Sequence, residues 1–79
     1  MSNMMNADLV GTDLSYADLP LSNLSYTNLQ GANLKGANLQ QADLSYSNLS
    51  DSDLSFANLR DAKLGGSDLQ NAKLDKAIW

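Results

Sequence analysis

Cysteine and histidine are both missing from this 79-residue chain, and proline, tryptophan and phenylalanine each occur once. Without cysteine the chain has no disulfide framework and no thiol chemistry. A hydrolase needs a base beside its nucleophile, and neither histidine nor cysteine is available for such a pair. No run of 18 apolar residues is present, so the sequence predicts no membrane-spanning segment.

Basic residues are also scarce, since five Lys and Arg stand against nine Asp and the net charge is −4. Direct nucleic-acid binding requires a basic groove, so we expect none from this acidic chain. Residues 1–10 lack the basic start and apolar centre of a secretory signal. We therefore expect a cytoplasmic protein.

What the chain does contain is a five-residue period that runs through almost its whole length. Leucine occupies every fifth position, namely 9, 14, 19, 24, 29, 34, 39, 44, 49, 54, 59, 64, 69 and 74. Met4 and Trp79 hold the same phase at the two ends. Two residues before each Leu stands a small residue, never larger than Thr, and most Leu residues follow directly on Asp or Asn.

This period excludes the two ordinary secondary structures. In an α-helix, at about 100° per residue, successive Leu side chains would be rotated by about 140° and would form no apolar stripe. In a flat strand, an odd spacing would send successive Leu side chains to opposite faces. A chain that bends once per pentad avoids both problems, because each Leu and its small neighbour then point into a closed coil.

The unit Ala-(Asp/Asn)-Leu-x-x resembles the repeat of the pentapeptide repeat family, and the resemblance covers residues 7–77. It implies an all-β, right-handed quadrilateral β-helix with four pentads, or 20 residues, in each coil. Sixteen pentads, counting those of Met4 and Trp79, then give about four coils. We expect a single domain over residues 1–79, with degenerate end pentads at 2–6 and 77–79.

The aromatic residues share one outward position in this register, the second variable position of the pentad. Tyr26 and Tyr46 are 20 residues apart, so we expect them to stack on adjacent coils. Tyr16 and Phe56 share the opposite corner but are separated by Gly36, which predicts a gap between them. Two interpretations are open: packing that shields the corners, or a surface that contacts another protein.

The Asn/Asp column is expected to bond to nearby backbone and, between stacked coils, to form amide ladders. The pairs placed one coil apart are Asn28 with Asn48 and Asn38 with Asn58. Asp51 and Asp53 are the closest pair of carboxylates, and we interpret them as solvated corner residues. No Gly-Gly-x-Gly-x-Asp calcium motif occurs, so we expect no metal and no cofactor.

The ends of the coil carry no capping helix in the sequence, and an open β edge promotes association. Met4, Ile78 and Trp79 are the candidate residues for end-to-end association into a homodimer. Two alternatives remain: a C-terminal extension has been removed, or Met4 and Trp79 alone cap a monomer.

The function expected from these features is a non-enzymatic structural or protein-interaction module whose partner is another protein. The resemblance also offers an alternative, because some family members imitate duplex DNA and bind DNA gyrase. Four coils about 4.8 Å apart make a rod about 19 Å long, over which DNA would carry about eleven charges. Nine Asp diluted by five basic residues make a weak imitation.

Overall fold

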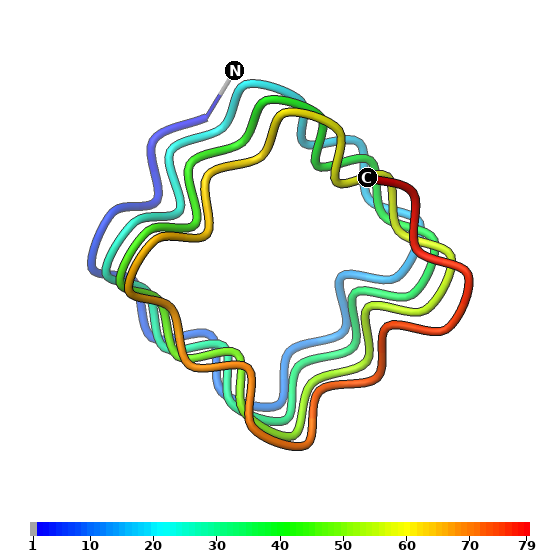
Figure 1. Cartoon of the computed structure of the whole chain (residues 1–79). Helices are drawn as coiled ribbons and strands as arrows, with labels where there is room; N and C mark the ends of the chain where they lie inside the picture. The colour runs from blue at the N-terminus through cyan, green and yellow to red at the C-terminus, as the bar shows by residue number, and fades with distance from the viewer. Residues whose placement is uncertain (1) are drawn as a thin grey trace.

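The chain is wound into a stack of coils, described by a computed structural model for residues 2–79. Viewed along the stack, the coils superimpose as a four-cornered ring (Figure 1). The chain turns counter-clockwise in this view while it advances from the faded N-terminal coil toward the viewer. The coil is therefore right-handed, as the resemblance implied.

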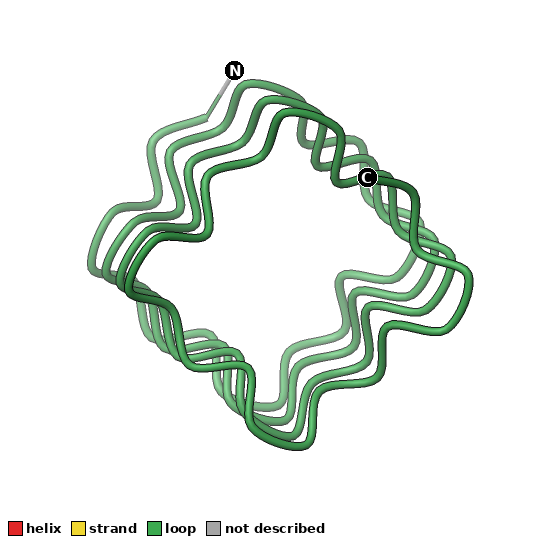
Figure 2. Cartoon of the chain, viewed as in Figure 1, coloured by secondary structure: helices red, strands yellow, loops and turns green. Residues whose placement is uncertain are grey.

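Residues 2–79 contain no helix and no continuous strand, and the whole ribbon is drawn as loops and turns (Figure 2). Each pentad instead contributes one isolated bridge residue between two corners, because a bend every five residues leaves little extended backbone. The bridges are parallel and join residues 20 apart, from Asn3 with Asn23 to Asn58 with Ile78. The predicted period of 20 residues per coil is confirmed. Residues 2–79 therefore hold no helical segment that could span a membrane.

Backbone hydrogen bonds join each coil to both of its neighbours. The N–H of Leu49 donates to the carbonyl of Asp68 in the next coil (2.7 Å), while Asn48 donates to Thr27 in the coil before (2.9 Å). A third bond forms at the corner, where the N–H of Asp51 donates to the carbonyl of Gln70 (2.9 Å). The same three bonds recur along the inner coils, so this backbone is held on two sides.

Every corner is a tight turn that places its second central residue in the left-handed region. Fifteen such residues, every fifth one from Asn6 to Lys76, have φ between 58° and 72°. A positive φ at the second central residue alone is characteristic of the type II turn, in which proline suits the first. Pro20 and Leu21 occupy these two positions, and the Leu21 side chain is exposed there.

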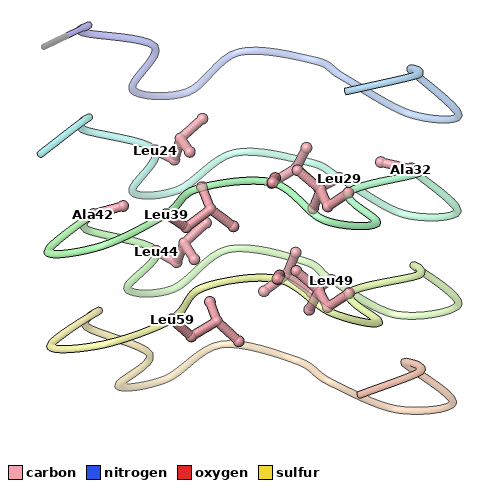
Figure 3. Packing of buried hydrophobic residues seen from close by; sticks show 12 residues of the cluster. Leu24, Leu29, Ala32, Leu39, Ala42, Leu44, Leu49 and Leu59 are labelled. Atoms are coloured by element: carbon pink, nitrogen blue, oxygen red, sulfur yellow. The ribbon is translucent and has the colours of Figure 1, made fainter. Parts of the chain in front are cut away.

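The interior is filled by the Leu and the small residues, as the period predicted (Figure 3). The buried leucines are Leu24, Leu29, Leu34, Leu39, Leu44, Leu49, Leu54 and Leu59. The hydroxyl groups of Thr27 and Ser47 donate to the carbonyls of Leu24 and Leu44 (2.7 Å each), which satisfies them inside the coil. Ser22 differs, because its buried hydroxyl has no hydrogen-bond partner among residues 2–79. The outer leucines and Met4 pack against the same core but are only partly buried.

Candidate interaction surfaces

Most side chains of the Asn/Asp column are occupied by their own turns. The Oδ1 atom accepts the backbone N–H two residues later, as Asn33 does from Lys35 and Asp53 from Ser55 (3.0 and 2.9 Å). Asn and Asp share this acceptor, which explains why the column alternates freely between them. Asp18 is an exception with a plain cause: the residue two positions on is Pro20, which has no N–H to donate.

An amide ladder runs along one face of the solenoid. The Asn38 side-chain nitrogen donates to Asp18 Oδ1 (3.2 Å), and Asn58 donates in turn to Asn38 Oδ1 at the longer distance of 3.5 Å. The ladder predicted for Asn38 and Asn58 is therefore present. Asn28 and Asn48 are paired through their backbones, but no hydrogen bond joins their side chains within residues 2–79.

Three carboxyl groups of the column, those of Asp13, Asp43 and Asp53, have pKa values below the usual range. The main cause is a side-chain hydrogen bond from the serine two residues later, followed by that serine's backbone N–H. Asp53 belongs to the closest carboxylate pair of the sequence, with Asp51. Asp53 is half-buried at a bridge position and its carboxylate is held by its own turn, so the interpretation as a solvated corner residue fits Asp51, which is exposed at the corner, but not Asp53.

The Tyr26 and Tyr46 rings stack on adjacent coils, as predicted from their spacing. Their centroids are 5.1 Å apart and their planes are inclined by 15°, while 56% and 61% of the two residues remain exposed. The Tyr46 ring also covers Gly66, where an added Cβ would lie 2.5 Å from the ring. The result is a continuous aromatic surface along one corner, held by rigid backbone, which we call the tyrosine corner.

At the opposite corner the rings of Tyr16 and Phe56 are not stacked within residues 2–79, but the space over Gly36 is occupied. The Tyr16 ring lies there, so close that a Cβ on Gly36 would be 2.5 Å from it. Phe56 is accompanied by two ammonium groups, those of Lys35 and Lys76, at 5.9 and 5.8 Å from its ring centroid. Sequence reasoning missed these cation–π contacts, although Lys76 follows Phe56 by one coil.

Within residues 2–79 there is no pocket and no cluster of three or more potential metal ligands. At the ends of the stack, Trp79 is 63% and Ile78 41% exposed, whereas Met4 is half-buried. The structure thus places the residues predicted for association at the two open coils, and the aromatic residues on the sides.

Several solved structures resemble the chain. Rfr23, a pentapeptide repeat protein from the cyanobacterium Cyanothece 51142, is 37% identical over 100% of this chain, with a TM-score of 0.74. A pentapeptide repeat protein of the Arabidopsis thaliana thylakoid lumen is 31% identical over 92% of the chain, with a TM-score of 0.61. QnrB1, a plasmid-mediated fluoroquinolone resistance protein, is 31% identical over 89% of the chain, with a TM-score of 0.61.

The chain spans 59%, 54% and 38% of the lengths of these three proteins, respectively. No curated protein matches the chain in sequence. The family model for pentapeptide repeats matches residues 2–41 and 37–75, which together are nearly the whole chain. The chain therefore belongs to the pentapeptide repeat family.

Proposed function

We propose that this protein is a non-enzymatic interaction module that binds another protein through the tyrosine corner. The observation that carries the proposal is the stack of Tyr26 on Tyr46, more than half exposed on backbone that is hydrogen-bonded on both sides. Tyrosine is enriched where proteins meet, because it combines a large apolar area with a polar end. A ring that is already fixed loses little conformational entropy on binding.

The surroundings of the tyrosine corner suit a protein partner. The first variable positions beside it are Ser25, Ser45 and Gly65, which are small and uncharged. A partner can therefore approach the rings closely past these side chains; a charged group beside them is Asp43, whose Oδ1 accepts the N–H of Ser45.

The test compares two double variants in a binding experiment. Tyr26→Ser with Tyr46→Ser removes the stack. Leu21→Ser with Gln41→Ser is the matched control, because these residues occupy the same turn position on two adjacent coils at another corner. Proteins captured by the immobilised chain are identified, and the purified candidate is then titrated against each form.

We expect the tyrosine variant to raise the dissociation constant at least tenfold and the control to leave it within about twofold. Circular dichroism and thermal unfolding establish that both variants keep the fold. Equal binding by all three forms would contradict the proposal, as would equal loss in the two variants.

A second candidate function, imitation of DNA toward a gyrase, is favoured by the likeness to QnrB1. The charges argue against it, because the face centred on Leu14, Leu34, Leu54 and Leu74 carries three Lys beside three Asp. DNA carries about one negative charge per 1.7 Å and no positive one. In a supercoiling assay with purified gyrase we expect no inhibition, and inhibition at micromolar concentration would replace the first proposal with this one.

We also propose that the protein acts in the cytoplasm. The Arabidopsis relative is a lumenal protein, so cell fractionation with an antibody to the chain is the appropriate test.

A further inference from the structure

The last coil carries a set of backbone groups without partners. In the inner coils, two N–H groups of each pentad donate to the carbonyl nineteen residues later. One belongs to the Leu, as in Leu49 to Asp68, and the other to the second central residue of the turn, as in Asp51 to Gln70. Within residues 2–79, the equivalent donors of the last coil have no such acceptor. They include Asp61, Leu64, Gly66, Leu69, Asn71, Leu74 and Lys76. The carbonyls of Ala62, Ser67 and Ala72 likewise accept no backbone bond from a following coil. We call this surface the C-terminal edge.

The first coil carries the complementary set. Within the described residues, carbonyls of this coil at the equivalent acceptor positions receive no backbone bond; they include those of Asn3, Met5, Asp8, Val10, Asp13, Ser15 and Asp18. The N–H groups of Asn3, Asp8, Asp13 and Asp18 donate to no backbone carbonyl there. This N-terminal edge is thus rich in acceptors, whereas the C-terminal edge is rich in donors.

We propose that a second copy of this chain stacks head-to-tail on the first, its N-terminal edge on the first copy's C-terminal edge. A shift of four whole coils continues the bridge pattern without a change of phase. Leu69 then donates to Asp8 of the second copy, as Leu49 donates to Asp68 within one chain. Asp8 of the second copy donates to Ser67, as Asp68 does to Ser47.

Charge supports the same pairing. Residues 2–21 contain three Asp and no basic residue, while residues 62–79 contain three of the five basic residues of the chain. In the proposed register Asp13 of the second copy lies over Lys73, whose backbone pairs with that of Asp53 on its other side, while Asp8 of the second copy lies over Asp68. With Asp68 and Asp75 counted, residues 62–79 carry a net charge of +1 against −3 for residues 2–21, so the two edges attract overall.

A two-fold dimer would not satisfy these edges. Two C-terminal edges would set a donor-rich surface against another and would bring Lys63, Lys73 and Lys76 of both copies together. The head-to-tail contact is heterologous, so every addition leaves a free edge at each end and growth is open-ended. The edge chemistry thus favours an array over the closed homodimer expected from the sequence.

The first measurement is the weight-average mass of the 79-residue chain by analytical ultracentrifugation over a wide concentration range. We expect the mass to rise from 8.5 kDa with concentration and to reach no plateau at the dimer. A constant monomer mass, or a plateau at twice that mass, would overturn the proposal.

The second measurement uses variants blocked at one edge. Ala17→Lys and Ala72→Lys each place a long charged side chain at a half-buried small position in an open outer coil. Each variant keeps one intact edge, so each alone should be monomeric, while an equimolar mixture should form a 1:1 dimer that grows no further. Gln41→Lys adds the same charge on the side of the stack and should associate like the parent chain. Self-association of either blocked variant alone would refute the head-to-tail contact.

A milder pair of variants covers the case in which an interior lysine unfolds its coil. Asp13→Lys changes an exposed position of a column that already holds Lys at 63 and 73, and should raise the association midpoint about tenfold. Asp51→Lys makes the same change on an inner coil and should leave the midpoint unaltered. Equal midpoints for the two variants would contradict the proposal. None of these substitutions touches the tyrosine corner, so failure here is distinct from failure of the proposed protein binding.

Discussion

The inner and outer coils are built from the same pentad, yet their leucines are in different environments. Leu34 and Leu39 are fully buried in the middle of the stack, whereas Leu14 and Leu74 are only partly buried near its ends. The residue type and its direction are the same in both regions. The difference is the number of neighbouring coils, so burial in this fold depends on stacking and each coil is stabilised by the next.

The largest effect on stability is expected when one leucine in each region is truncated to alanine. We expect Leu39→Ala to lower the free energy of unfolding by about 2–5 kcal/mol, because it leaves a cavity between two coils. Leu14→Ala should cost about 1 kcal/mol, since its site is already open on one side. Urea unfolding measures both, with Gln40→Ala as a surface control expected to cost under about 0.5 kcal/mol. Equal costs at 39 and 14 would remove the distinction between inner and outer coils.

The next test concerns Gly36, which couples the first coil to the second through the Tyr16 ring. Gly36→Ala should cost about 1–2 kcal/mol, because it strains a φ of +69° and displaces that ring. Gly31→Ala has the same φ with open space around it, and should cost about 1 kcal/mol from strain alone. Gly65→Ala has neither problem and should stabilise the fold by about 0.4–1 kcal/mol.

A double-variant cycle separates strain from displacement at Gly36. In a Tyr16→Ser background, Gly36→Ala should cost no more than Gly31→Ala does, as measured by thermal unfolding. If the cost at 36 is unchanged without the ring, the contact between Tyr16 and Gly36 contributes nothing to the attachment of the first coil.

A smaller effect is expected from the amide ladder, which ties Asp18 of the first coil to Asn38 and Asn58. Asn38→Asp keeps the Oδ1 acceptor for its own turn but removes the donor and sets a second carboxylate beside Asp18. We expect a loss of about 0.5–1 kcal/mol. Asn28→Asp is the matched control, because no ladder bond involves Asn28 in residues 2–79. Equal losses at the two sites in urea titrations would show that the ladder bond is not stabilising.

The smallest effect is expected from acid. The pKa values of Asp13, Asp43 and Asp53 are lowered in the folded state, so their contribution to stability is present near neutral pH. This contribution to stability is lost as the pH falls below the ordinary pKa of Asp, about 4, and through the lowered pKa values of the folded state. The combined variant Asp13→Asn, Asp43→Asn, Asp53→Asn keeps the turn acceptors and should flatten the acid limb of the unfolding midpoint. An acid limb as steep in this variant as in the parent chain would contradict the expectation.

The aromatic residues show how far sequence reasoning reaches in this fold. A spacing of one coil was enough to predict the stack of Tyr26 on Tyr46. It was not enough to predict that the Tyr16 ring fills the space over Gly36, because this depends on the direction in which a side chain leans from its corner. The ammonium groups beside Phe56 were missed for the same reason, since long lysine side chains reach positions that the register does not specify.

The sequence by itself determined the five-residue period and the inward and outward positions, because a small and a large apolar residue in each pentad both need a closed interior. The stacking of residues 20 apart followed from the resemblance to the pentapeptide repeat family, which implies four pentads per coil. Only the tertiary structure decided how completely each Leu is buried, which Asn side chains form a ladder, and how donors and acceptors divide between the two edges. Each of these depends on the coil above or below, and a repeat that looks alike everywhere in sequence does not specify which neighbours a given coil has.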